Sequence, residues 1–274
     1  MSQAVASTPT PMVEPQTAPS EPERQRYRLV VAYDGTNFHG WQKQKTEAGV
    51  WLRTVQGELE VAVMAAVQQP VRLIGASRTD SGVHALGQVA QFDAATRIPV
   101  CRLADAINAR LEEDVEVVSA AKVPPKFDAI SGARAKQYRY RILCSRRRAL
   151  HLRNYVYRCW WKLDVEAMNA AAQILVGEHD FTGFCAAGSP RLSNVRTVFA
   201  CAAEAGEPPN EIHIVISGNG FLYNMVRIIA GTLVEVGRGA MPVAQVAQAL
   251  AEKNRRLAGP TMPPEGLWLE WVRY

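Results

Sequence analysis

TVQGELEVAVMAAVQQ, residues 54–69, is the stretch that decides how the first half of the chain folds. Its apolar residues recur at the spacing of one helix face, and Pro70 follows directly and ends the helix. The stretch lies between two runs with strand patterns, YRLVVAYD (27–34) and VRLIGAS (71–77). The pattern therefore predicts a strand, a helix and a strand in succession. The apolar positions of the helix are Val55, Leu59, Val63, Ala66 and Val67.

Further periodic segments extend this unit in both directions. The first half reads β-α-β-β-α-β, and the second half repeats that order with an additional helix before its last strand. We therefore predict an α+β fold of two ferredoxin-like halves, with their sheets side by side around a central cleft. The further segments are strands at 87–94, 114–123, 134–144, 195–204, 211–219 and 267–274, and helices at 100–111, 164–177, 221–237 and 242–253.

Three regions follow from this pattern. Residues 1–26 hold five of the sixteen prolines and no apolar periodicity, so a disordered N-terminal tail is predicted. Residues 27–125 form the first half, which contains Asp80, and residues 126–274 form the second half, which contains a basic and aromatic strand.

Composition argues against several classes of protein. There is no run of about eighteen apolar residues and no basic cap before an apolar stretch, so neither a membrane span nor a secretory signal is expected. The five cysteines are at least fifteen residues apart, which excludes a CxxC metal pair and is typical of reduced thiols in a cytoplasm. Phosphate-loop, dinucleotide and zinc motifs are missing, so we expect neither a metal nor a cofactor.

Positive charge is concentrated in one part of the chain. The formal net charge is +5, but residues 129–163 contain ten Lys or Arg and no Asp or Glu, with six tyrosines and tryptophans interleaved. This mixture suits RNA, because cations contact phosphates and rings stack on exposed bases. The alternative is a solvated strand pair whose tyrosines pack inward. The predicted RNA contacts are Arg146, Arg147 and Arg148.

Two short segments place charges where a fold rarely needs them. RTDSG (78–82) separates two apolar runs, and NMVRIIAGTL (224–233) carries a charge inside an apolar helix. Asp80 in this context commonly forms a turn, whereas a catalytic Asp must stay ionised in a partly dry cleft. Arg227 either points outward or pairs with a carboxylate of the other half, because an unpaired buried charge is costly. Asp80 would be that carboxylate.

A tyrosine in the basic strand is the third candidate. KQYRY (136–140) places Tyr138 and Tyr140 on one face of a strand, where both rings can simply pack in the core. The functional alternative gives one ring to a flat substrate and its hydroxyl to proton transfer. Arg78, two residues before Asp80, then remains available for the substrate.

SRTDSGVHALGQVAQF (77–92) resembles the active-site segment of the bacterial tRNA pseudouridine synthase A family, usually written GRTDxGVHAxGQV. Five further blocks resemble this family in the same order, so the resemblance covers most of residues 27–274. These blocks are YRLVVAYDGTNFHGWQKQ (27–44), KQYRYRI (136–142), GEHDFTGFCA (177–186), GNGFLYNMVRIIAGTLVEVGRG (218–239) and PPEGLWLEWVRY (263–274).

The resemblance implies an enzyme that isomerises uridine to pseudouridine in the anticodon stem-loop of tRNA, at positions 38, 39 and 40. It implies a cytoplasmic homodimer that flips the target base and needs no cofactor. Asp80 would start the reaction as nucleophile or base, Tyr138 would stack on the uracil and is a candidate base, and Arg227 would pair with Asp80. Arg78 would enter the RNA and help to turn the nucleotide out.

Three positions depart from the family pattern. Ser77 replaces the usual glycine, Ser81 replaces a frequent alanine, and Ile130 stands where an arginine is common. None of these removes a group that the chemistry needs, although Ile130 would weaken one RNA contact.

Two other functions compete with the isomerase. A non-enzymatic RNA-binding module would need paired aromatic strands of the RNP type, which the sequence lacks, and it has no use for Asp80 opposite Arg227. A base-excising glycosylase also flips bases and uses an Asp, but it releases free uracil, whereas an isomerase leaves the mass of the RNA unchanged.

Overall fold

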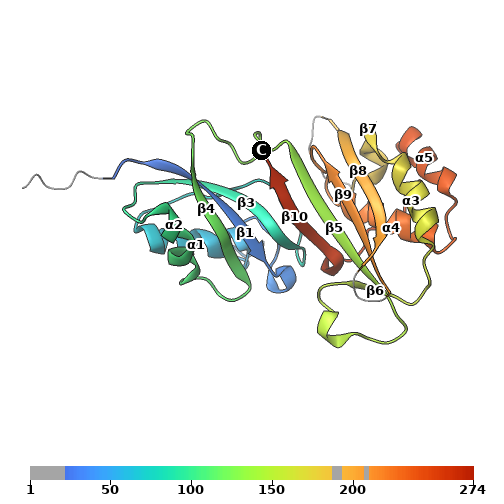
Figure 1. Ribbon diagram of the computed structural model, residues 1–274, viewed down its shortest axis with the longest axis horizontal. Helices are drawn as coiled ribbons and strands as arrows, with labels where there is room; N and C mark the ends of the chain where they lie inside the picture. The colour runs from blue at the N-terminus through green and yellow to red at the C-terminus, as the bar shows by residue number, and fades with distance from the viewer. Residues whose placement is uncertain (1–21, 187–192, 207–209) are drawn as a thin grey trace, which may run out of the picture.

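The computed structural model describes residues 22–186, 193–206 and 210–274, which form one mixed α/β structure around a ten-stranded sheet (Figure 1). The mixed class that the sequence predicts is confirmed. Across the described residues, no helix combines the length and the apolar character needed to cross a membrane.

The first half begins with an alternating strand and a well-capped helix. Its elements are β1 (Gln25–Tyr33), α1 (Val55–Val67), β2 (Ile74–Gly75), β3 (His84–Ala94), α2 (Val100–Asn108) and β4 (Val115–Val123). Thr54 caps α1 by accepting a hydrogen bond from Gly57 N, and Gln68 in a left-handed conformation ends it. Alternate residues of β1 are buried, because one face of the strand meets the core.

The second half also consists of strands and helices, but it is longer than the first and contains more of them. They are β5 (Ala135–Cys144), β6 (Tyr157–Cys159), α3 (Val165–Ile174), β7 (Gly177–Asp180), β8 (Val195–Ala205), β9 (Glu211–Gly218), α4 (Met225–Gly237), α5 (Val243–Ala251) and β10 (Leu267–Arg273). Asp164 caps α3 by accepting from Ala167 N at 3.0 Å. Eleven of the thirteen residues of α4 are buried, so this helix lies in the interior of its half.

The strands run in the order β4-β1-β3-β10-β5-β9-β8-β7, with β2 beside β3 and β6 beside β5. Neighbours are antiparallel except for the pairs β10–β3 and β5–β6, which are parallel. If the main strands of each half are numbered along the chain, with β6 and β7 left out, the sets β4-β1-β3-β2 and β10-β5-β9-β8 both read fourth, first, third, second. One continuous sheet results, with the last strand of the chain at its centre.

The joint between the two sets is the pairing of β10 with β3. Trp268 is opposite His84 and Leu269 is opposite Ala85. Gly87 lets the strands approach closely, because a Cβ there would lie 2.4 Å from the carbonyl oxygen of Glu270. The two halves are consequently fixed to each other by backbone pairing as well as by side chains.

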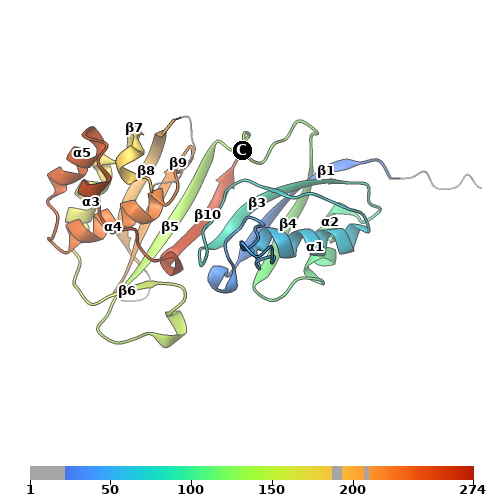
Figure 2. The same ribbon diagram turned by 180° about the vertical axis from the view of Figure 1, so that it is seen from behind.

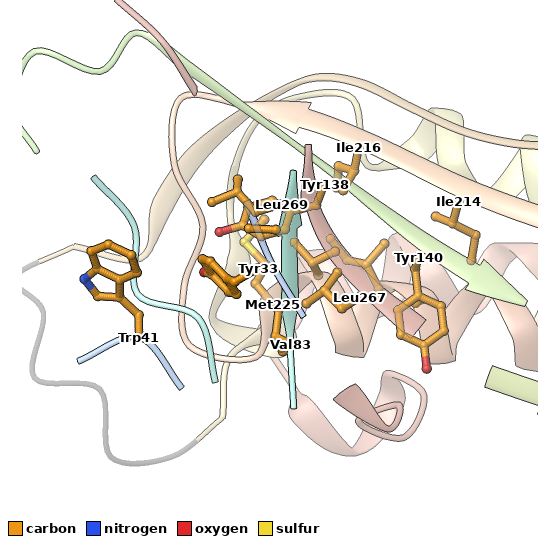
Figure 3. Close-up of a cluster of buried hydrophobic side chains, with 14 of the residues drawn as sticks. Tyr33, Trp41, Val83, Tyr138, Tyr140, Ile214, Ile216, Met225, Leu267 and Leu269 are labelled. Carbon is orange, nitrogen blue, oxygen red and sulfur yellow. The ribbon is translucent and has the colours of Figure 1, made fainter. Parts of the chain in front are cut away.

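The helices form two groups, one at each end of the sheet, and the central strands lie between the two groups. Opposite views show α1 and α2 against the first set of strands, and α3, α4 and α5 against the second (Figure 1 and Figure 2). Buried side chains nevertheless form one cluster across the joint, where Tyr33 and Val83 of the first half lie near Tyr138, Met225 and Leu269 of the second (Figure 3).

Several predicted boundaries differ from the structure. The helix predicted at 164–177 ends at Ile174, and the short strands β6 and β7 are not predicted at all. Residues 1–21 of the predicted tail lie outside the described residues, but Gln25 and Arg26 already belong to β1, because their backbone pairs with Ala94 and Asp93 of β3. The predicted strand 71–77 is reduced to the two residues of β2. The predicted helix 221–237 begins only at Met225, since Asn224 has a φ of 59°.

Candidate active site

The loop between β2 and β3 carries Asp80 on a tight turn. Val83 N donates to Asp80 O at 3.2 Å, and Gly82 has a φ of +78°, a conformation that favours glycine. The turn occupies only the backbone of Asp80, so the carboxylate remains free to interact. The turn and the charged site that the sequence offered as alternatives therefore exist together.

Surrounding side chains hold this loop in place. The amide of Gln88, which is fully buried, accepts from Ser77 N at 3.2 Å and donates to Ser77 O at 2.6 Å. The hydroxyl groups of Tyr33 and Thr79 are hydrogen-bonded at 2.8 Å, and Trp41 N donates to Thr79 O at 3.0 Å. A loop fixed at several atoms can present a carboxylate with little freedom, as a catalytic group requires.

Arg227 reaches Asp80 from the opposite half. Its Nη1 atom lies 3.2 Å from Asp80 Oδ2, and the side chains are 16% and 33% exposed, respectively. The guanidinium also donates to the carbonyl oxygen of Met262 at 2.6 Å and to Asn224 Oδ1 at 2.9 Å. The predicted pairing is present, and it places the guanidinium group of one half against the carboxylate of the other.

Tyr138 lies beside this pair on β5 and is buried, with 5% of its surface exposed. Its hydroxyl is hydrogen-bonded to Ser77 Oγ at 2.9 Å, and the ring of Phe221 meets it edge-on with centroids 5.2 Å apart. Burial is the main cause that raises the pKa of Tyr138 to about 12. The hydrogen bond with Ser77 opposes this shift, and the negative charge of Asp80 adds to it. At neutral pH the phenol is therefore protonated.

The raised pKa of Tyr138 predicts a loss of stability at alkaline pH. An unfolded tyrosine ionises near pH 10, whereas the folded protein keeps this proton to about pH 12, so unfolding becomes easier as pH rises through that window. The contribution is roughly 3 kcal/mol when fully lost. Denaturant titrations from pH 9 to 12 should show a shallower decline for Tyr138→Phe than for the wild type; equal declines would contradict this.

Arg78 differs from the other candidates. It is exposed, and within the described residues it forms no hydrogen bond or ion pair. The structure thus leaves its side chain open to solvent next to the Asp80 turn. This position suits a residue that contacts a substrate rather than one that sets the charge of Asp80.

The structure shows the surroundings of the three residues that depart from the family pattern. Ser77 supplies the hydroxyl that is bonded to Tyr138, and Ser81 Oγ donates to Phe38 O at 3.0 Å. Ile130 is 59% exposed. Phe221 is a site neighbour that the sequence did not single out, and Ser77 stood out only by its departure from the glycine usual at that position.

The basic segment divides into two parts. On β5, Arg139 pairs with Glu270 at 2.7 Å and Arg141 with Glu211 at 2.5 Å, while Tyr138 and Tyr140 pack inward. This part matches the structural alternative. After β5, Arg146, Arg147 and Arg148 are all exposed and, among the residues that the structure describes, have no ion-pair partner.

Comparisons with known proteins place the chain among RNA-modifying isomerases. The family model for tRNA pseudouridine synthase matches residues 29–130 and 171–274. The chain belongs to the tRNA pseudouridine synthase family, which isomerises uridine to pseudouridine in tRNA. The family and the isomerase activity predicted from the sequence motifs are thereby confirmed.

Curated relatives cover nearly the same length. A tRNA pseudouridine synthase A of Thermoanaerobacter sp. (strain X514) is 46% identical over 246 residues, which are 90% of this chain and 98% of the relative. That of Halalkalibacterium halodurans is also 46% identical, over 88% and 90% of the two chains. A solved Cbf5-Nop10-Gar1 complex is only a distant match, with 10% identity, a TM-score of 0.32, and coverage of 89% of this chain and 48% of that one.

Proposed function

We propose that this chain converts uridines 38, 39 and 40 in the anticodon stem-loop of tRNA to pseudouridine, with Asp80, Tyr138 and Arg227 as its catalytic groups. The observation that carries the assignment of these residues is the Asp80–Arg227 pair, which joins the two halves beside Tyr138. The substrate class is that of the family, and the three positions are the finer part of the proposal.

The reaction breaks the N1–C1′ bond, turns the uracil and joins C5 to C1′. The base must first leave its stack, at a cost of roughly a few kcal/mol. We assign that step to Arg78, which is exposed beside the catalytic turn. Asp80 then acts as nucleophile on the nucleoside or as base on the sugar, and both routes need the ionised carboxylate that Arg227 stabilises.

Tyr138 supplies a flat wall for the detached uracil. Its phenol is protonated at neutral pH and hydrogen-bonded to Ser77 Oγ, so in the resting site it can donate a hydrogen bond. Since the ring is 5% exposed, side chains packed around it, of which Phe221 is one, have to rearrange before a uracil can stack on its face.

The finer points of architecture and assembly belong to the same proposal. The repeated strand order supports two ferredoxin-like halves, residues 27–125 and 126–274, and a substrate site between them. The proposed assembly is a homodimer in the cytoplasm, and Arg146, Arg147 and Arg148 are proposed to contact tRNA phosphates.

An unmodified tRNA transcript tests the function. After incubation with the protein, carbodiimide mapping should show pseudouridine at positions 38, 39 and 40 wherever the transcript has uridine there. A transcript with cytidine at those positions is the matched control and should stay unmodified. Release of free uracil would favour a glycosylase, and a bound but chemically unchanged transcript would favour an RNA-binding module.

A further inference from the structure

A cavity of about 320 Å³ lies beside β6, in the second half. Three arginines line it, Arg148, Arg153 and Arg158, together with apolar and aromatic side chains that include Leu150 and Tyr157. Glu265 is the one carboxylate among its lining residues. The cavity therefore combines an excess of positive charge with an apolar wall.

The three guanidinium groups have spare donors. Arg153 donates to the carbonyl oxygen of Leu150 at 3.0 Å, and Arg158 donates to that of Ser145 at 3.2 Å. Within the described part of the chain, none of the three forms an ion pair, in contrast to the arginines of β5. Each guanidinium has five N–H donors, so most of them remain available to an anion.

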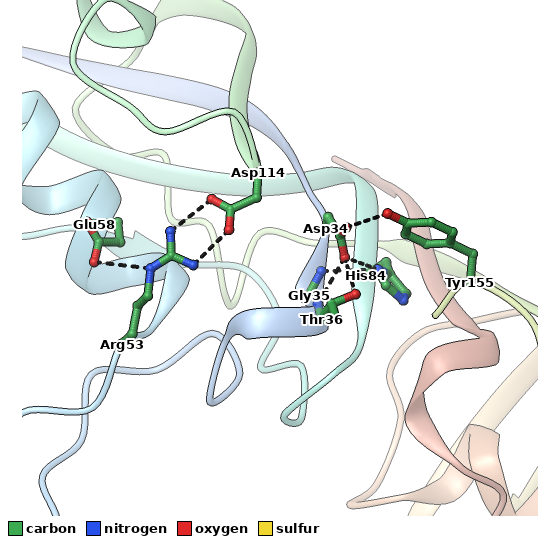
Figure 4. Close-up of polar contacts among 8 residues, drawn as sticks. All are labelled: Asp34, Gly35, Thr36, Arg53, Glu58, His84, Asp114 and Tyr155. Carbon is green, nitrogen blue, oxygen red and sulfur yellow. Dashed lines mark hydrogen bonds and ion pairs between the residues drawn. The ribbon is translucent and has the colours of Figure 1, made fainter. Parts of the chain in front are cut away.

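The segment that forms this cavity is fixed to the first half. Tyr155 OH donates to Asp34 Oδ2 at 2.7 Å, and the fully buried His84 donates from Nε2 to Asn154 O at 2.8 Å. Trp268 Nε1 of β10 donates to Tyr155 O at 3.3 Å. Figure 4 shows Tyr155 and His84 meeting at Asp34.

These contacts set the cavity at a fixed place relative to the catalytic turn. His84 opens the strand that follows the turn of Asp80. On the other side, Glu265 of the cavity follows Pro264, whose ring lies 2.9 Å from where a Cβ of Gly82 would be. A group bound in the cavity would thus be held in register with Asp80.

We propose that this cavity binds a phosphate of the tRNA backbone through Arg148, Arg153 and Arg158, with the attached sugar against Leu150 and Tyr157. The proposal rests on the proposed function and adds a specific anchoring site to it. Several guanidinium donors around one anion match phosphate geometry, and a volume of about 320 Å³ accommodates a nucleotide unit rather than a phosphate alone.

Binding of an unmodified tRNA transcript, followed by fluorescence anisotropy at several salt concentrations, tests the site. Arg148→Gln, Arg153→Gln and Arg158→Gln should each weaken binding by about tenfold, as expected for a lost charge-assisted hydrogen bond, and lower the salt slope by about one. Glu265→Gln removes the one opposing charge and should strengthen binding by roughly threefold.

Arg102→Gln is the matched control, because Arg102 is an exposed arginine on α2, at the far end of the sheet from β6. It should bind like the wild type, and Arg158→Lys, which keeps the charge, should recover part of the loss. Cavity variants that keep the affinity and salt slope of the control, or a Glu265→Gln variant that binds more weakly, would overturn the proposal. Pseudouridine formation by the wild type separates this result from a failure of the proposed function.

Discussion

Asp80→Asn is expected to abolish pseudouridine formation, with a loss of about a thousandfold or more, typical of removing a group that acts on the reacting atoms. The amide has nearly the same shape and can still accept a hydrogen bond from Arg227, so the turn should survive. It cannot act as nucleophile or base. Single-turnover assays with radiolabelled tRNA measure the rate, and anisotropy should show tRNA binding close to that of the wild type.

Asp105→Asn is the control for this variant, since Asp105 is an exposed carboxylate on α2. It should turn over like the wild type. An Asp80→Asn variant that retains near-normal turnover would remove Asp80 from the mechanism, whereas one that loses tRNA binding as well would give it a structural role.

Arg227→Met is expected to lower both activity and stability. Methionine fills much of the same volume but leaves the Asp80 carboxylate without its partner and the Met262 carbonyl without a donor. Breaking a fully buried pair costs about 3–5 kcal/mol; because Asp80 is 33% exposed, we expect a smaller loss, about 1–2 kcal/mol. Activity should fall by about a hundredfold or more, since the carboxylate is no longer oriented.

The double variant Asp80→Asn/Arg227→Met distinguishes instability caused by the unpaired charge from instability caused by altered packing. If the unpaired charge causes the instability, removing it should restore part of the free energy of unfolding, measured by denaturant titration. Strictly additive losses would argue against coupling. Arg102→Met is the control, because Arg102 pairs with Asp105 on α2 with side chains that are 73% and 67% exposed, and such a pair should contribute little.

Much of the fold could be predicted because its signals are local. Helical spacing and Pro70 locate α1 to within two residues at its end, and alternation locates β1, β5 and β9. The start of α4 was missed because Asn224 adopts a left-handed conformation, which apolar periodicity does not encode. The position of β10 in the middle of the sheet depends on pairing between distant segments, so no local pattern could give it.

The site shows the same division. A charge inside an apolar helix indicated that Arg227 needs a carboxylate, and the structure supplies Asp80. The bond between Ser77 and Tyr138 depends on how two loops and a strand meet, and sequence alone carries no signal for it. The sequence also does not separate paired from unpaired arginines in the basic segment. Only the structure shows that Arg139 and Arg141 are neutralised by glutamates that lie far away in the sequence.

The central place of β10 has a consequence for how the molecule is made. Residues 267–273 leave the ribosome after every other strand of this sheet, yet they fill the gap between β3 and β5. Until they arrive, the stretches of β3 and β5 that β10 covers are unpaired edges, which makes the nascent chain prone to association. Synthesis of the last strand then completes the backbone pairing that joins the two halves of the site.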